Sequence, residues 1–89
     1  MVWKIRFNPR VEKELKKLHP SVQKKIIIYL KQQIASQENP RLFGKSLHGN
    51  MQGLWRYRVG DYRIICQILD HELIILVVKV GHRKHIYLD

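Results

Sequence analysis

The sequence predicts an α+β fold in which two N-terminal helices pack on one face of an antiparallel sheet, in the order β-α-α-β-β-β. Apolar residues alternate over residues 2–7 and again from residue 53 onward, and two helical repeats lie between these stretches. Alternation with a period of two indicates a half-buried strand, whereas apolar residues recurring every three or four positions indicate an amphipathic helix. Because the chain has 89 residues, we expect one domain spanning residues 1–89.

The first strand, residues 2–7, runs directly into a helix signal. Asn8 is a favourable N-cap, and Pro9 suits the first helical position. The apolar stripe of this short helix consists of Val11, Leu15 and Leu18. His19 and Pro20 then interrupt the pattern, because proline disfavours helical backbone at the residue before it.

Ser21 begins the second, longer predicted helix. Its apolar stripe consists of Val22, Ile26, Tyr29, Leu30 and Ile34. Residues 37–52 follow without clear periodicity. A loop of this length is unusual in a small domain, and such loops often carry function.

The C-terminal half predicts three consecutive strands. Residues 53–59 and 62–69 form a hairpin with its turn at Gly60-Asp61, and residues 70–72 form the next turn. Residues 73–80 are strongly apolar, which is typical of a strand inside a sheet. We expect these strands to form an antiparallel meander, with the first strand pairing to an edge or to the last strand.

Strand alternation separates an apolar face from a basic one. The helices should cover the face holding Trp3, Ile5, Phe7, Trp55 and Tyr57. The opposite face should carry Arg6, Arg56, Arg58, Arg63 and Lys79. Guanidinium groups on neighbouring rungs repel one another, so stability alone does not explain their grouping. A bound polyanion would explain it, and a solvated basic face is the alternative.

Composition points to the same kind of partner. Seventeen Lys and Arg residues against seven Asp and Glu give a net charge of +10, which favours an anionic partner. Nucleic acid fits best. A membrane surface fits less well, because the basic residues also occupy strands and the C-terminus. An acidic protein partner is also compatible with this charge. No apolar run approaches the roughly 20 residues of a membrane helix, and no signal peptide is visible.

A single cysteine, Cys66, excludes an internal disulfide and fits a reducing cytoplasm. Its isoleucine neighbours favour a buried, inert thiol. His82 and His85 are three residues apart, but no further ligands complete a metal site, so we expect neither metal nor cofactor. Cations and tyrosine remain, and these suit cleavage of RNA by its own 2′-hydroxyl, since arginines stabilise the charge that develops on the phosphate.

Three stretches together resemble the RelE/ParE toxin superfamily. They are Leu-His-Gly at 47–49, Gly-Leu-Trp-Arg-Tyr-Arg-Val-Gly-Asp-Tyr-Arg-Ile-Ile at 53–65, and Val-Gly-His-Arg-Lys-His-Ile-Tyr at 80–87. The resemblance covers the whole chain and implies the RelE-like microbial RNase fold. The RelE branch cleaves mRNA on the ribosome and is held inactive by a cognate antitoxin. The ParE branch inhibits DNA gyrase and lacks the nuclease residues.

The RelE catalytic pattern carries over to five positions of this chain. By resemblance, Arg56, Arg58 and Arg63 bind and stabilise the scissile phosphate. Arg83 neutralises or protonates the leaving group, and Tyr87 orients or deprotonates the 2′-hydroxyl or stacks on the substrate base. RelE has lysines where Arg56 and Arg58 stand, which keeps the charge but alters hydrogen-bond geometry.

The spacing from Arg83 to Tyr87 is shorter than in RelE, and His82 and His85 offer alternative proton carriers. The resemblance therefore predicts a cytoplasmic, metal-independent endoribonuclease, the toxin of a type II toxin–antitoxin pair. Its expected partners are an acidic antitoxin, the ribosome and mRNA, with no membrane. The alternatives are a gyrase inhibitor without catalysis and a toxin relic that only binds its antitoxin.

Overall fold

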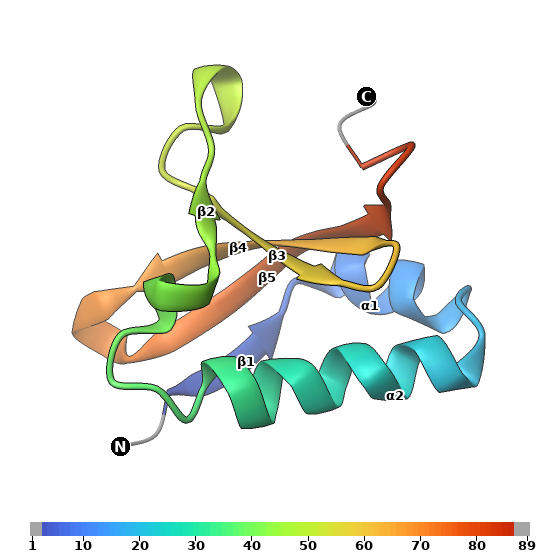
Figure 1. Ribbon diagram of the computed structural model, residues 1–89, viewed down its shortest axis with the longest axis horizontal. Coiled ribbons are helices and arrows are strands. Elements are labelled where there is room, and N and C mark those ends of the chain that lie inside the picture. The colour runs from blue at the N-terminus through green and yellow to red at the C-terminus, as the bar shows by residue number, and fades with distance from the viewer. Residues whose placement is uncertain (1–2, 87–89) are drawn as a thin grey trace.

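The computed structural model describes residues 3–86, in which two helices lie against one face of a five-stranded sheet (Figure 1). The strands are β1 (Lys4–Phe7), β2 (Lys45–Ser46), β3 (Trp55–Val59), β4 (Tyr62–Leu69) and β5 (Ile74–His82). The helices are α1 (Pro9–Lys16) and α2 (Pro20–Tyr29), and a π-helical turn, Leu30–Ile34, continues α2. Short 3₁₀ turns occupy Pro40–Phe43, Gly49–Met51 and Asp70–Glu72. The fold class is as the sequence predicts.

Both helices begin where side-chain caps and prolines direct them. The Asn8 side chain accepts a hydrogen bond of 2.9 Å from the Arg10 backbone N–H, with Pro9 at the first helical position. His19 performs the same task for α2, because its Nδ1 accepts the Ser21 backbone N–H at 3.1 Å. The second helix therefore starts at Pro20, one residue earlier than predicted, since proline is well suited to the first turn.

The sheet has the order β1-β5-β4-β3-β2, and β1 runs parallel to β5. Pairing of the first strand with the last was one of the two predicted arrangements. The remaining pairs are antiparallel, so the sheet is mixed rather than wholly antiparallel as expected. Only strands joined by a short turn are forced to be antiparallel. Here nearly the whole chain separates β1 from β5.

The predicted loop over residues 37–52 contains more structure than expected. Lys45 and Ser46 form β2, which pairs with Arg56 and Trp55 of β3. A strand of two residues is too short for alternation to show in the sequence. Beyond it, the chain rises in an arm on the side of the sheet away from the helices, where the segment after β5 also lies (Figure 1).

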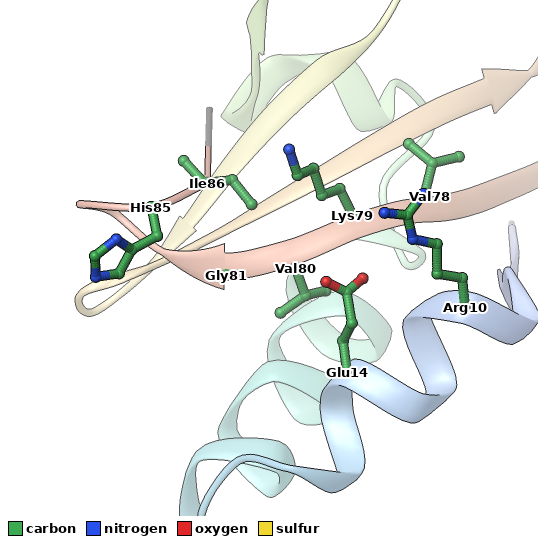
Figure 2. A pocket seen from close by; sticks show the side chains of 8 residues that line it. All are labelled: Arg10, Glu14, Val78, Lys79, Val80, Gly81, His85 and Ile86. Carbon is green, nitrogen blue, oxygen red and sulfur yellow. The ribbon is translucent and has the colours of Figure 1, made fainter. Parts of the chain in front are cut away.

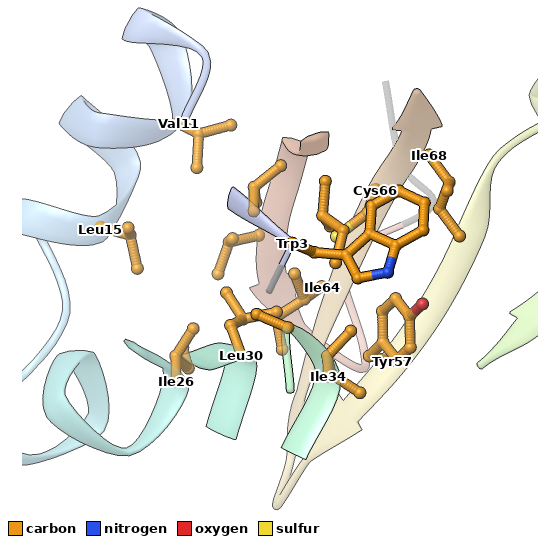
Figure 3. Packing of buried hydrophobic residues seen from close by; sticks show 14 residues of the cluster. Trp3, Val11, Leu15, Ile26, Leu30, Ile34, Tyr57, Ile64, Cys66 and Ile68 are labelled. Atoms are coloured by element: carbon orange, nitrogen blue, oxygen red, sulfur yellow. The ribbon is translucent and has the colours of Figure 1, made fainter. Parts of the chain in front are cut away.

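The core fills the space between the helices and the sheet (Figure 3). Trp3 and Tyr57 are buried there, and Ile5, Phe7 and Trp55 pack against it, as the alternation predicted. Cys66 is fully buried, and burial raises the pKa of its thiol. Within residues 3–86, no helix combines the length and the apolar character needed to cross a bilayer.

Tyr57 joins this core to the region before β2. Its hydroxyl donates a hydrogen bond of 2.5 Å to the Pro40 carbonyl, and burial raises the pKa of the phenol. Gly44 lies directly against the ring, since a Cβ there would be 2.9 Å from Tyr57 Cε1. Tyr57 therefore serves packing on the helix-covered face, although it lies between two arginines in sequence.

Candidate functional site

The strand register gathers positive charge on the sheet face that the helices leave uncovered. Arg58 of β3 lies directly opposite Arg63 of β4. Arg56 lies opposite Ile65, which in turn pairs with Lys79 of β5. Cross-strand neighbours have Cβ atoms about 5 Å apart, so these cations share one electrostatic field. We call the group the basic face; its members are Lys45, Arg56, Arg58, Arg63 and Lys79.

Two of these cations were not among the predicted catalytic positions. Lys45 reaches the basic face because β2 pairs it with Arg56, and no sequence signal announces a strand of two residues. Lys79 was expected on this face from alternation alone. Arg6 shares the side of the sheet but pairs with Leu76, which lies opposite Gln67. Strand dimensions place Arg6 roughly 15 Å from Arg63, outside the cluster.

Arg63 is oriented by the hairpin turn itself. Its Nη1 donates to the carbonyl oxygens of Gly60 at 3.0 Å and Tyr62 at 3.1 Å. Gly60 adopts a φ of 57°, a left-handed conformation that glycine accepts readily. The turn thus holds one end of the guanidinium, and among residues 3–86 no hydrogen bond occupies Nε or Nη2, which can meet a ligand.

Arg83 lies just after β5 and is tied to the same turn. Its backbone N–H donates to the Asp61 carbonyl at 2.7 Å, and its Nε lies 3.6 Å from Asp61 Oδ1. Both side chains of this ion pair are mostly exposed, so an approaching phosphate can compete with the carboxylate for Arg83. Asp61 was not singled out in the sequence, because its partner lies 22 positions later.

The rings of His82 and His85 are neighbours, with centroids 6.1 Å apart. His82 pairs with Tyr62, so it belongs to the opposite side of the sheet from Arg63. Its ring packs edge-on against Tyr62 at 5.7 Å between centroids, and its Nδ1 accepts the Lys84 backbone N–H at 3.1 Å. His85 lies in the turn beyond β5 and is exposed. The structure therefore does not bring His82 onto the basic face.

The turn after β5 is attached to the sheet by Ile86, which is 1% exposed. A Cβ on Gly81 would lie 3.2 Å from Ile86 Cδ1, so the isoleucine packs directly on this glycine. Gly81 is the strand partner of Arg63. Figure 2 shows Ile86 and Lys79 on one side of β5, and Val80 on the side of α1. Tyr87, the remaining predicted site residue, lies outside the described residues.

A cavity of about 440 Å³ opens beside this attachment, between α1 and β5 (Figure 2). It is lined by Arg10, Glu14, Val78, Lys79, Val80, Gly81, His85 and Ile86. The part of the chain that the structure describes has no group of three or more His, Cys, Asp or Glu side chains placed to hold a metal ion. The chemical resources of the basic face are arginine and lysine side chains, with a cavity adjoining it at the edge of β5.

Comparison with known proteins identifies the protein family. Residues 5–87 match the family model described as the ParE toxin of the type II toxin–antitoxin system parDE. The chain is also similar to the toxin RelG of Mycobacterium tuberculosis, with 26% identity over 87 residues, covering 98% of each chain.

Solved structures share the fold. A toxin in a RelBE toxin–antitoxin complex of Mycobacterium tuberculosis superposes with a TM-score of 0.84 at 24% identity, covering 93% of each chain. A substituted, free RelE toxin of Escherichia coli gives 0.77 at 26% identity, covering 94% of this chain and 86% of RelE. The family match spans nearly the whole chain, and we conclude that this protein belongs to the ParE toxin family of type II toxin–antitoxin systems, within the RelE/ParE superfamily.

Proposed function

We propose that this toxin is a metal-independent endoribonuclease that cleaves mRNA during translation on the ribosome. The observation that carries the proposal is the cross-strand pair of Arg58 and Arg63, with Arg56 two residues further along β3. The register gathers several guanidinium groups on one sheet face, where a target without phosphate would gain less from them. A phosphate that becomes more negative during the reaction would gain most.

The proposed reaction is attack of the 2′-hydroxyl of the RNA on its own neighbouring phosphate. The 2′-oxygen loses its proton and bonds to phosphorus, the bond from phosphorus to the 5′-oxygen breaks, and that oxygen takes a proton. Arg56, Arg58 and Arg63 stabilise the pentacoordinate phosphorane between these steps. Arg63 enters the reaction already oriented by two carbonyl oxygens, so little reorganisation accompanies catalysis.

The segment after β5 is proposed to supply the groups that act on the 2′-hydroxyl and on the departing 5′-oxygen. Arg83 lies beside the hairpin turn, where it can leave Asp61 to neutralise or protonate the departing 5′-oxygen. Tyr87 follows the attached Ile86 in sequence and is proposed to orient or deprotonate the 2′-hydroxyl, or to stack on the substrate base. The alternative proton carriers His82 and His85 have neighbouring rings, and His85 is the more exposed of the two and lines the adjoining cavity.

An acidic antitoxin is the proposed regulator. Similar toxins have been solved together with antitoxins, in complexes from Mycobacterium tuberculosis and Pyrococcus horikoshii. A disordered acidic segment that folds on binding can cover a wide basic surface with a short chain. It should block the basic face or displace the segment carrying Tyr87. A complex that leaves Arg56, Arg58, Arg63 and Tyr87 open and in place would contradict this mode of inhibition. With an mRNA substrate, the toxin would act in the cytoplasm.

The second candidate is a gyrase inhibitor without catalysis, and the observation in its favour is the ParE family model that the chain matches. Induced expression separates the two. A nuclease stops protein synthesis before DNA synthesis, with mRNAs cut inside translated regions, and Arg63→Ala abolishes both effects. Early DNA-damage signalling with intact mRNA would contradict the nuclease and support the inhibitor. A chain that binds its antitoxin but never slows growth would be a relic.

A further inference from the structure

The cavity between α1 and β5 combines apolar walls with a carboxylate, and a site for phosphate alone needs neither. It lies at the open edge of β5, because β1 pairs with this strand only as far as Val77. Its volume of about 440 Å³ falls within the roughly 300–1,000 Å³ of pockets that bind small organic groups. Val78, Val80 and Ile86 give it apolar walls, while charge comes from Arg10 and Glu14 of α1 and from Lys79 of β5.

Glu14 is the unusual member of that lining. Glu14 is half-buried, whereas Glu12, Lys13 and Lys16 of the same helix are exposed. Arg10 lies one helical turn earlier and faces the same cavity, and Figure 2 shows both side chains extending from α1 toward β5. Within residues 3–86, neither side chain forms a hydrogen bond or an ion pair. Acceptor and donor groups therefore face the cavity together.

A carboxylate at this place repels phosphate but accepts hydrogen bonds from N–H groups. A nucleobase presents both features that the cavity offers to satisfy: flat apolar faces and an edge with donors and acceptors. Bases of single-stranded RNA are commonly read in this way, with the ring packed on side chains and its edge hydrogen-bonded. Arg10 and Lys79 of the lining would also attract a phosphate, so it is Glu14 together with the apolar walls that favours a base.

The cavity also lies at the right place for such a base. Gly81 forms part of its wall and is the strand partner of Arg63. One strand spacing, about 4.8 Å, separates the two backbones. Arg63 lies on the uncovered face and Glu14 on the helical side, and the cavity joins the two sides at the edge of β5 that β1 leaves unpaired. A nucleotide whose phosphate contacts Arg63 can therefore place an adjoining base over Gly81 and around this edge toward Glu14.

We infer that this cavity receives a nucleobase next to the scissile phosphate, and that Glu14 selects bases with an exocyclic amino group over uracil. The inference rests on the proposed mRNA cleavage and adds a specificity site to it. Adenine, cytosine and guanine each offer an amino N–H to the carboxylate. Uracil offers carbonyl oxygens on either side of its one ring N–H, and these oxygens face the carboxylate unfavourably.

The test is single-turnover cleavage on ribosomes programmed with codons that carry A, C, G or U at each position in turn. At one position, the wild-type toxin should prefer the amino bases over uracil by about tenfold, the scale of one good side-chain contact to a base edge. Glu14→Gln should largely remove that preference, because the new amide can donate to a uracil carbonyl. Glu12→Gln removes the same charge from an exposed site of the same helix and should leave the profile unchanged.

The inference is overturned if wild type cleaves and Glu14→Gln gives the same base profile, even when that variant binds antitoxin more weakly. A wild-type toxin that cleaves no programmed ribosome would instead count against the proposed function. The cavity is then tested alone by NMR titration of the toxin with uncleavable 2′-O-methyl trinucleotides AAA and UUU. Amide shifts at Gly81 and Ile86 that are larger for AAA and absent in Glu14→Gln support the site, and equal or missing shifts overturn it.

Discussion

Neighbouring residues of β3 belong to two different regions of the molecule. Tyr57 is fully buried, anchors the Pro40 carbonyl and packs on Gly44. Arg56 and Arg58, on either side of it, face away from the helices toward Arg63 and Lys79. One face of the strand therefore holds the fold together, and the other concentrates charge at some cost in repulsion. Substitutions on the two faces should separate stability from activity.

Tyr57→Ala should produce the largest loss of stability. Removing a fully buried aromatic ring costs about 3–5 kcal/mol, a large part of the roughly 5–15 kcal/mol typical of a folded domain. Arg58→Ala, one residue away and exposed, should change the free energy of unfolding by less than about 0.5 kcal/mol. Urea denaturation of both variants measures the difference. Equal losses would mean that the two faces are not distinct.

Two glycines, one beside each region, should respond differently to a methyl group. Gly44→Ala puts a methyl group 2.9 Å from the Tyr57 ring and 3.4 Å from the Arg56 carbonyl oxygen, so it should cost about 1–3 kcal/mol of stability. Gly81→Ala instead puts a methyl group 3.2 Å from Ile86 Cδ1, a less severe contact than that at Gly44. Its stability should fall by less, while cleavage drops about tenfold because the segment after β5 shifts. Urea denaturation and single-turnover cleavage measure the two effects for both variants. A Gly81→Ala toxin with full activity would mean that Ile86 is not the contact that positions the segment after β5.

Lysines on the helices should act through attachment rather than chemistry. Lys13, Lys16, Lys24 and Lys25 are exposed on the helical layer, away from the basic face. Replacing one with alanine should weaken ribosome binding and lower its salt dependence by about one counterion. Binding measured across a salt series tests this. Saturating toxin should restore the cleavage rate, and a rate that stays low at saturation would place the lysine in the chemistry.

The smallest effect concerns acid stability. The hydrogen-bonded Arg41 guanidinium, 2.7 Å from Asp70, lowers the pKa of that carboxyl below its usual value near 3.8. A lowered pKa gives stability that is present above the ordinary value and lost as pH falls through the folded one. Asp70→Asn should therefore unfold more readily than wild type at pH 6, and the difference should begin to shrink as the pH falls below about 4 and disappear only below the lowered pKa of the folded state. Because the pair is exposed, we expect the difference to be small.

Most of the fold could be predicted from the sequence, because its signals are local. The Asn8-Pro9 cap, the His19-Pro20 break and the Gly60-Asp61 turn all lie where their chemistry places them. The parallel pairing of β1 with β5 and the short strand β2 could not be predicted, since both depend on contacts between distant segments.

The candidate site shows the same division. Alternation placed Arg56, Arg58 and Arg63 on one face, and the register agrees. It could not reveal that Arg63 is held by turn carbonyls, that Arg83 pairs with Asp61, or that Glu14 faces a cavity beside Gly81. Those relations follow from side-chain paths and from packing between elements, neither of which has a period in the sequence.

Arg63→Ala tests whether the cluster at the β3–β4 hairpin is the catalytic centre, as proposed here. At saturating ribosome concentration, single-turnover cleavage should fall roughly 10²–10³-fold, the usual loss for one transition-state donor. Ribosome binding should change little, and folding should be retained, as judged by urea denaturation. If Arg63→Ala cleaves at the wild-type rate once ribosomes are saturated, the hairpin is not the catalytic centre.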